Sequence, residues 1–531
     1  MYNFDEVIDR RHTNALNTDG FRDYIFHADE TMTFPYKDEE FIRMWVADME
    51  FATPDVVVDG IRERLEHKIF GYTRVFEKRY YDAFSAWCQR HYDFHFDRKE
   101  LVMSNGIVPA LYELVEYICR PDEKVLFLSP SYAYFKHAAE FSGREFVCSP
   151  LNNSDGYYTI DFEDFEKRAA DEKTTLFIFC NPHNPSGRVW REEELRRLAE
   201  ICEKYGLWVI SDEIHCDLLR LGQHHIPMGK IMPEYKRLIT CMAASKTFNL
   251  AGMMISNILI RDEGLRAVWL DRHYNFDNPL SIAAVQAAYE KGEPWLMELR
   301  AYLDENFRFT EIYLKEHLPE AGFRISESTY LAWVDLSAYF EPDENLPMFF
   351  AYKAGVLLEG GNMFVQDSDC FIRLNLACPR ATLEKGLIWE NSSNGHGTQG
   401  LPGPPERSGS GSRFASRRSP VNRLAQSFWI SLAIMSAVFP SVSILMVLRA
   451  GYIGILEALR SMMSAERIPR SISLDNRSRR ILGLTVRETH FKKQFSVYSR
   501  SRIVLIMPCS CMTQQKMIFS YAEHFRKLFS K

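Results

Sequence analysis

Short apolar runs recur along the first 390 residues, separated by longer stretches whose apolar positions follow helical spacing. The runs that suit buried strands lie at 125–128, 176–180, 207–211, 238–242 and 255–260. Strands that alternate with helices predict an α/β fold with a mostly parallel sheet covered by helices. Such sheets bind ligands beyond the carboxyl ends of their strands, so the residues that follow each run are candidates for chemistry.

Two stretches between these runs carry the periodicity of amphipathic helices. In 191–205 the apolar residues recur three and four positions apart, and Gly206 follows as a helix stop. A second helix opens after Gly106, and its apolar face comprises Val108, Leu111, Val115 and Ile118. Backbone N–H groups at a helix start suit a phosphate, although a glycine before a helix is common in any protein.

The composition changes near residue 390. Residues 391–531 contain 21 Lys and Arg against 6 Asp and Glu, whereas residues 1–390 contain 43 against 65. Ser, Gly, Pro and Arg dominate 391–419, which predicts a linker. The following stretch 428–448 has no charge and is long enough to span a bilayer. We expect an atypical tail produced by a frameshift or an incorrect gene model; a membrane-tethered enzyme is the alternative.

Cysteine usage and the N-terminal residues indicate a reduced, cytoplasmic protein. The eleven cysteines are scattered, and the first residues, MYNFDEVIDRR, lack the charged-then-apolar pattern of a signal peptide. No metal site is expected, because neither Cys509 and Cys511 nor His224 and His225 have further ligands at the usual spacing. The acidic front of the chain does not suggest nucleic acid as a partner.

Two charged residues follow apolar runs directly. Lys246, in the segment ASKTFNLAG, would stand at a strand end in a dry pocket, where desolvation lowers the pKa of an amine and makes it nucleophilic. Asp212 closes another run, and a buried carboxylate there requires a cation such as a protonated pyridine nitrogen. A solvated lysine and a helix-capping or ion-paired aspartate are the alternatives.

Two further polar residues stand in unusual surroundings. Asn184, in the segment NPHNPSG, follows an apolar run and can donate a hydrogen bond to a ring oxygen, although a plain loop has the same composition. Arg373 lies within the apolar segment CFIRLNLACPR. A buried arginine requires a carboxylate, which a substrate or an internal Asp or Glu could supply.

Together these segments resemble the fold type I pyridoxal-phosphate enzymes, the aminotransferase class I/II superfamily. The resemblance covers residues 1 to about 388, and Asn184, Asp212 and Lys246 follow in the family's order and spacing. It implies an aspartate aminotransferase-like fold with a large domain and a smaller α+β C-terminal domain. The implied divisions are an N-terminal arm at 1–45, a cofactor-binding domain at 46–275, a small domain at 276–390 and the atypical tail at 391–531.

The resemblance also implies roles around the ring of pyridoxal 5'-phosphate. Lys246 matches the Schiff-base lysine, and Asp212 matches the partner of the pyridine nitrogen. Asn184 matches the residue that bonds the phenolic oxygen of the ring. Tyr132 matches the aromatic residue stacked on the ring. His215 lies beside the cofactor motif of Asp212 in the sequence, and we expect it to be a positioning residue and not the essential base.

Further roles concern the phosphate and the substrate. Gly106 and Ile107 match the phosphate-binding amides, and Ser245 is expected to contact the cofactor beside the Schiff-base lysine. Tyr72 matches a tyrosine that reaches the phosphate of a partner subunit, and this match is the basis for expecting a homodimer. Arg373 matches the arginine that grips the α-carboxylate of the substrate.

Details resemble the carbon–sulfur lyase branch, the cystathionine β-lyases and cystalysin-type enzymes. The segment MWVADMEF at 44–51 is similar to that branch's WVADMDF, and TYLAW at 329–333 and NLACP at 375–379 also look like it. His215 stands where most aminotransferases carry a tyrosine. Met254 stands where many carry a phosphate-binding arginine, which leaves the phosphate contacts open.

The branch implies β-elimination on a sulfur amino acid, a reaction of methionine biosynthesis. Cystathionine or a related S-substituted cysteine would yield a thiol such as homocysteine, with pyruvate and ammonia. Lys246 would remove the Cα proton while Arg373 orients the carboxylate. An aminotransferase that uses the same contacts is the nearest alternative, and a regulatory protein on an enzyme-like fold is an alternative of another class.

Overall fold

The computed structural model describes residues 2–274 and 276–387. The predicted tail, with its apolar stretch 428–448 and with Cys509 and Cys511, lies outside these residues. Within the described part of the chain, no helix combines the length and the apolar character needed to cross a bilayer.

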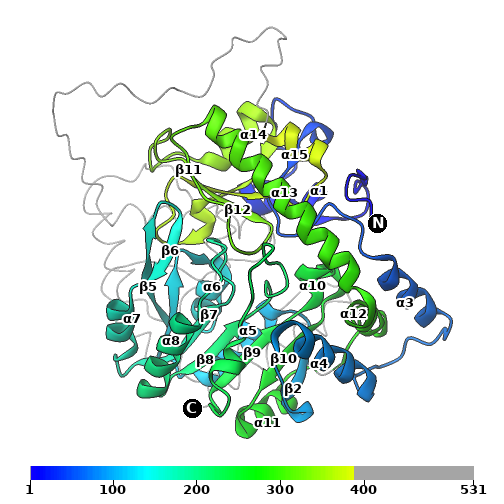
Figure 1. Cartoon of the computed structure of the whole chain (residues 1–531), viewed down its shortest axis with the longest axis vertical. Helices are drawn as coiled ribbons and strands as arrows, with labels where there is room; N and C mark the ends of the chain where they lie inside the picture. Colours follow the sequence, from blue (N-terminus) through cyan, green and yellow to red (C-terminus); the bar gives the residue numbers. More distant parts are fainter. Residues whose placement is uncertain (1, 275, 388–531) are drawn as a thin grey trace, which may run out of the picture. The chain divides into compact units, whose positions relative to one another are not determined.

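An eight-stranded sheet forms the centre of the described structure (Figure 1). Its strands follow the order β2-β10-β9-β8-β7-β3-β5-β6. They are β2 (Leu101–Ser104), β10 (Ser256–Ile260), β9 (Leu238–Met242), β8 (Trp208–Asp212), β7 (Thr174–Cys180), β3 (Lys124–Ser129), β5 (Glu145–Ser154) and β6 (Tyr157–Ile160). The pairings from β9 to β5 are parallel, whereas β10 and β6 run antiparallel to their neighbours. The predicted mostly parallel sheet is therefore confirmed, with β10, next to the edge strand β2, and the edge strand β6 as the two reversed strands.

Helices bury both faces of this sheet. In β3, Val125 and Phe127 pack into the core formed with α5 (Ile107–Ile118), α6 (Ala133–Phe141) and α11 (Glu263–Arg272). Leu126 and Leu128 pack into the opposite core, with α7 (Phe162–Ala169), α8 (Glu192–Tyr205) and α9 (Met228–Ile231). Side chains of a strand alternate between faces, so a strand buried on both faces is apolar throughout.

The two predicted helices are present. Helix α8 ends as expected, because Gly206 adopts a left-handed φ of 66° and its N–H bonds the carbonyls of Cys202 and Glu203. Helix α5 buries Leu111 and Val115 as predicted, together with Ile107, Ala110 and Leu114. Val108 and Ile118 are only half-buried, because the face turned to the sheet is centred between the predicted positions.

A smaller four-stranded sheet follows in the chain. Its order is β11-β12-β16-β14, with β11 (Gly322–Phe323), β12 (Leu331–Asp335), β16 (Phe371–Asn375) and β14 (Glu359–Gly360). Helices α13 (Glu293–His317), α14 (Leu346–Ala354) and α15 (Arg380–Leu387) share its core. Figure 1 shows α13 extending from beside α12 (Pro279–Lys291) to this sheet, and its side chains enter the cores at both ends.

The N-terminal residues pack on the same smaller sheet region. Strand β1 (Ile42–Arg43) pairs in parallel with β13 (Val356–Leu357), and β4 (Ser131–Tyr132) pairs with β15 (Phe364–Val365). The remaining helices are α1 (Leu16–Asp19), α2 (Phe21–Phe26), α3 (Asp55–Leu65), α4 (Lys78–Tyr92) and α10 (Ala244–Thr247).

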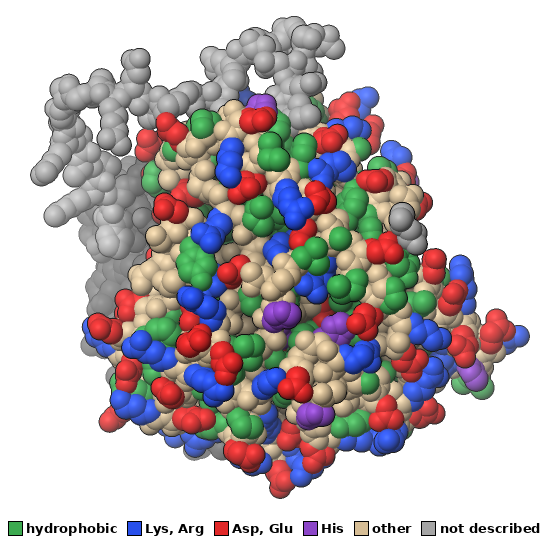
Figure 2. Space-filling model, in the orientation of Figure 1, with side chains coloured by type: hydrophobic (Ala, Val, Ile, Leu, Met, Phe, Trp, Pro, Cys, Tyr) green, Lys and Arg blue, Asp and Glu red, His purple; other side chains and the backbone are tan. Residues whose placement is uncertain are grey.

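On the face drawn in Figure 2, basic and acidic side chains are interspersed, as on a solvated surface of mixed charge.

Candidate active site

Three neighbouring parallel strands end side by side at one edge of the large sheet. In register, Asp212 of β8 lies between Cys180 of β7 and Cys241 of β9. The chain segments that leave these strands carry Asn184, Asp212 and Lys246. The sheet therefore gathers the three predicted cofactor residues at its carboxyl edge, where ligands bind in α/β sheets.

Lys246 is the third residue of the short helix α10, and its amine is held by a backbone carbonyl. Its Nζ donates a hydrogen bond to the backbone carbonyl of Ala47 at 2.6 Å. The Tyr330 hydroxyl donates to the same oxygen at 2.7 Å. Burial, together with the positive charge of Arg373, lowers the pKa of Lys246 to about 8. Far more of this amine is therefore neutral near physiological pH than of an ordinary lysine.

Asp212 is buried, and among the described residues it forms no ion pair. Its Oδ1 accepts only a long hydrogen bond from the Ile214 backbone N–H, at 3.2 Å. Desolvation raises the pKa of Asp212 to about 7. A cation placed beside this carboxylate would restore its charge, and a protonated pyridine nitrogen fits that requirement.

His215 has a buried ring nitrogen without a hydrogen-bond partner within the described structure. The residue is 3% exposed, and its Nδ1 has no hydrogen-bond partner within the described structure. Burial lowers the pKa of His215 to about 3, so its ring is neutral and keeps one donor and one acceptor. Such an orphaned atom beside Asp212 and Lys246 suits a ligand with polar ring substituents.

A glycine opens the helix at the proposed phosphate position. Gly106 caps α5 with a φ of 142°, a region that side chains rarely adopt, and a Cβ there would lie 3.3 Å from Pro109 Cδ. The first N–H groups of a helix have no acceptor inside it. Gly106 and the buried Ile107 therefore present donors that suit a phosphate, while Ser245 is half-buried next to Lys246.

Arg373 and Asn184 are brought into direct contact. Arg373 is 2% exposed, and its Nη1 donates to Asn184 Oδ1 at 3.1 Å. Its Nη2 forms an ion pair with Glu359, which is itself buried. The sequence left open whether the carboxylate partner of Arg373 is a substrate or an internal Asp or Glu. In the structure the partner is the internal residue Glu359. Because the Asn184 oxygen accepts from Arg373, its NH2 group is the part that can donate to a ligand.

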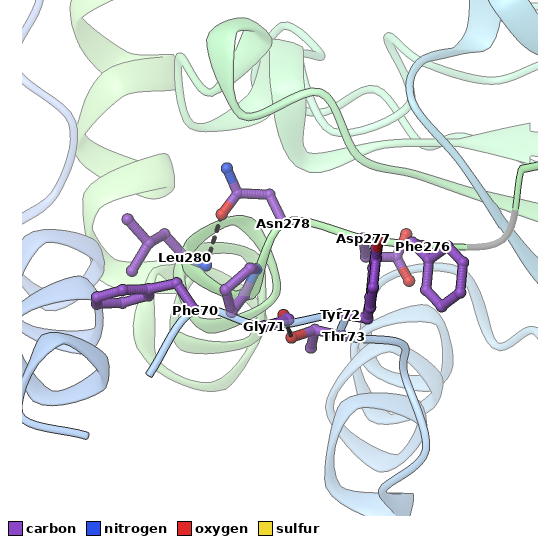
Figure 3. A pocket seen from close by; sticks show the side chains of 9 residues that line it. Phe70, Gly71, Tyr72, Thr73, Phe276, Asp277, Asn278 and Leu280 are labelled. Carbon is purple, nitrogen blue, oxygen red and sulfur yellow. Dashed lines mark hydrogen bonds between the residues drawn. The ribbon is translucent and has the colours of Figure 1, made fainter. Parts of the chain in front are cut away.

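The two predicted tyrosines lie in different surroundings. Tyr132 is half-buried at the start of α6, and burial raises its pKa well above the ordinary value, with Tyr24, Glu359 and Arg373 among the nearby groups. Tyr72 is 86% exposed. Its ring lies 5.0 Å from that of Phe276, in an open hollow of about 530 Å³ (Figure 3). The other predicted site residues do not line this hollow.

Three contacts at the site were missed by sequence reasoning. Ala47 contributes a backbone carbonyl, which no side-chain pattern reveals, and Tyr330 was noted only as part of a motif. Glu359 could have been found from the sequence, because it is a charged residue within the apolar run 356–360. A buried glutamate requires a cationic partner, just as the buried Arg373 requires a carboxylate.

Of the residues considered as metal ligands in the sequence, His225 lies beside a buried glutamate. His225 Nε2 lies 2.8 Å from Glu213 Oε2, and both side chains are fully buried. Among the described residues, no group of three or more His, Cys, Asp or Glu side chains is arranged to hold a metal ion.

The family described as aminotransferase class I and II matches residues 39–387, about two thirds of the chain. The chain belongs to this family. Cystathionine beta-lyase PatB of Bacillus subtilis is 40% identical over 349 residues, which cover 65% of this chain and 90% of PatB.

Solved structures agree with this assignment. The PLP-bound C-S lyase from Staphylococcus hominis is 50% identical, covers 73% of this chain and 97% of its own, and superposes with a TM-score of 0.70. Cystalysin from Treponema denticola, which contains pyridoxal 5'-phosphate, is 29% identical, covers 73% and 98%, and gives a TM-score of 0.69. The fold type I, aspartate aminotransferase-like prediction is confirmed.

Proposed function

We propose that this protein is a pyridoxal-phosphate-dependent carbon–sulfur β-lyase that cleaves cystathionine or related S-substituted cysteines to a thiol, pyruvate and ammonia. One observation carries the proposal beyond the family. The segment 44–51 and the segment 329–333, both similar to the lyase branch, meet at the reactive amine: Lys246 and Tyr330 donate to the same carbonyl of Ala47. The relatives that are named as lyases support the same choice.

The residues present fit the cofactor. Asp212 would hold the pyridine nitrogen, His215 and Asn184 would face the polar substituents of the ring, and Lys246 would bind its aldehyde carbon. Gly106, Ile107 and Ser245 would hold the phosphate, and Tyr132 would cover the ring. When bound, the cofactor supplies an electron sink for the charge that develops at Cα.

Two residues act on the substrate itself. Arg373 orients the α-carboxylate by a two-point interaction, which fixes the Cα–H bond relative to the amine. The neutral Lys246 amine takes the Cα proton. The bond between Cβ and sulfur then breaks, and its electron pair leaves with the thiolate. Water hydrolyses the remaining three-carbon product to pyruvate and ammonia.

The chain is also proposed to act as a homodimer. Tyr72 is highly exposed and lines one hollow with Phe70 and Phe276. The large side chains of Ile69, Phe76 and Tyr274, which lie near these residues in the sequence, are exposed as well. Isolated surface apolar residues are common, but a group of aromatic ones marks an interaction surface. In a dimer this surface would be covered, and Tyr72 would complete the phosphate site of the other copy.

We place the protein in the cytoplasm. All nine cysteines of the described residues are free and buried. Unpaired cysteines in this number suit a reducing compartment.

The decisive experiment follows pyruvate and free thiol during incubation of the cofactor-loaded protein with L-cystathionine, in the absence of any keto acid. Release that disappears in Lys246→Ala supports the lyase. A protein that reacts only after a keto acid is added would instead be an aminotransferase, because both enzymes share every cofactor contact described above. A protein that binds the cofactor but acts on neither mixture would favour the regulatory alternative.

A further inference from the structure

Glu359 and Arg373 face one another across two strands of the smaller sheet. They are directly opposed in the antiparallel register of β14 and β16, and their side chains form an ion pair. The side chains are 7% and 2% exposed. The residue proposed to hold the substrate carboxylate therefore already has a carboxylate bound to it.

The Arg373 guanidinium has one nitrogen without a hydrogen-bond partner within the described structure. Nη1 donates to Asn184 and Nη2 is paired with Glu359, whereas the buried Nε has no partner within the described structure. A guanidinium binds a carboxylate through two adjacent N–H groups. The edge formed by Nε and Nη2 can therefore take a further carboxylate, but only beside Glu359.

A second buried arginine shows how a purely structural pair differs. Arg188 uses all three guanidinium nitrogens: Nε bonds Tyr158, Nη1 bonds Val189 and Glu327, and Nη2 bonds Glu194. Nothing on Arg188 is left for a ligand. The unpaired Nε of Arg373 therefore distinguishes it from the fully bonded Arg188, although buried Arg220 also has an Nε with no partner within the described structure.

When a substrate carboxylate joins Glu359 at the Arg373 guanidinium, two negative charges share one positive charge in a site that is shielded from water. The groups that face Glu359 are Arg373 on β16, Lys246 on α10, and the phenols of Tyr24 on α2 and Tyr132 on β4. Burial already raises the pKa of Glu359, and Arg373 acts in the opposite direction. A second carboxylate raises that pKa again, because like charges disfavour ionisation.

We propose that Glu359 competes with the substrate α-carboxylate for Arg373, and that it takes up one proton when that carboxylate binds. This inference rests on the proposed function, since it assigns the substrate carboxylate to Arg373. Glu359 is thus a positioning residue that sets how tightly the substrate is held and makes its binding depend on pH. Binding is strongest where Glu359 can be protonated and weakens as pH rises.

The test uses 3-(methylthio)propionate, which has the carboxylate and the thioether but no amino group, so it cannot react with the cofactor. Calorimetric titration of the cofactor-loaded protein in two buffers with small and large heats of ionisation gives the number of protons taken up. We expect an uptake approaching one proton in the wild type and none in Glu359→Gln. The dissociation constant should fall about tenfold or more in Glu359→Gln at pH 8, and should lose its rise of about tenfold per pH unit.

Glu327→Gln is the matched control, because it neutralises a carboxylate that is paired with a different buried arginine, Arg188. It should leave both the affinity and the proton uptake as in the wild type. Equal affinity in Glu359→Gln and wild type, or the same proton uptake in both, would overturn the proposal. If Glu359→Gln does not fold, the wild type alone still tests the inference, since binding without proton uptake excludes it.

The same titration separates this inference from the proposed function. If the protein shows the expected proton uptake but releases no pyruvate from L-cystathionine, the role of Glu359 is supported and the lyase activity is refuted. If the protein releases pyruvate without any proton uptake, the lyase activity is supported and the role of Glu359 is refuted.

Discussion

The Arg373 guanidinium donates a hydrogen bond to the side-chain oxygen of Asn184 at 3.1 Å, although 189 positions separate the two residues. The contact joins a strand of the smaller sheet to the segment that follows β7 of the larger one. It fixes which end of the Asn184 amide faces the site, because the oxygen is occupied and the NH2 group is left to donate. The residue proposed to bind the substrate therefore also orients a residue proposed to bind the cofactor.

Arg373→Lys tests the two-point interaction with the substrate. A lysine keeps the positive charge but offers a point charge in place of a planar fork. We expect KM for L-cystathionine to rise roughly 30-fold, equivalent to about 2 kcal/mol, with a smaller change in kcat. Steady-state kinetics measure both. An unchanged KM would show that another residue holds the carboxylate.

Lys246 should be unusually reactive in the cofactor-free protein. With a pKa of about 8, half of its amine is neutral at pH 8, whereas an ordinary lysine is less than about 1% neutral there. Competitive labelling with an amine reagent, read by mass spectrometry, should modify Lys246 ahead of exposed Lys78. The preference should weaken towards pH 10, where ordinary lysines also lose their proton.

Asp212→Asn should stabilise the cofactor-free protein at high pH. Because burial raises the folded-state pKa of Asp212 to about 7, stability present at low pH is lost as pH rises from about 4 to 7. Asparagine removes this loss, so the melting temperature should rise by about 2 °C or more at pH 8 and change little at pH 4. The same variant should bind pyridoxal phosphate more weakly. A rise that is equal at both pH values would contradict the ionic explanation.

Gly106→Val should damage the phosphate position. Its φ of 142° is unfavourable for a β-branched residue, and the added Cβ meets Pro109. We expect a cost of about 1–3 kcal/mol and weaker binding of pyridoxal phosphate, measured by thermal unfolding and by fluorescence titration. Gly252→Ala is the control, because a Cβ at Gly252 has no neighbour within 4 Å.

Mixed oligomers test the role of Tyr72. Lys246→Ala and Tyr72→Ala should each be inactive, but refolding an equal mixture should restore about a quarter of the wild-type activity. The reason is that half of the dimers would be mixed, and each of these would have one site with both residues intact. No recovery, although light scattering shows dimers, would place Tyr72 outside the partner's site.

The sequence predicted those parts of the site that depend on local pattern and on parallel pairing. Asn184, Asp212 and Lys246 each follow an apolar run, and adjacent parallel strands necessarily bring such residues to one edge. The family and the cofactor class are confirmed, while the roles of individual residues and the domain boundaries at 45 and 275 remain predictions.

Other features were not accessible from the sequence. The pairing of Glu359 with Arg373 depends on the register of β14, a strand of two residues that no periodicity can identify. The reversed direction of β10 was also invisible, because the pattern of a strand buried on both faces does not depend on which way it runs.

The carbonyl of Ala47 has a further consequence for the movement of Lys246. The amine must leave this contact when it bonds the aldehyde carbon of the cofactor, and a buried oxygen abandoned by its donor costs free energy. Tyr330 donates to the same oxygen, so that oxygen keeps one partner when Lys246 turns to the cofactor. The second donor therefore lowers the free-energy cost of loading the protein with its cofactor.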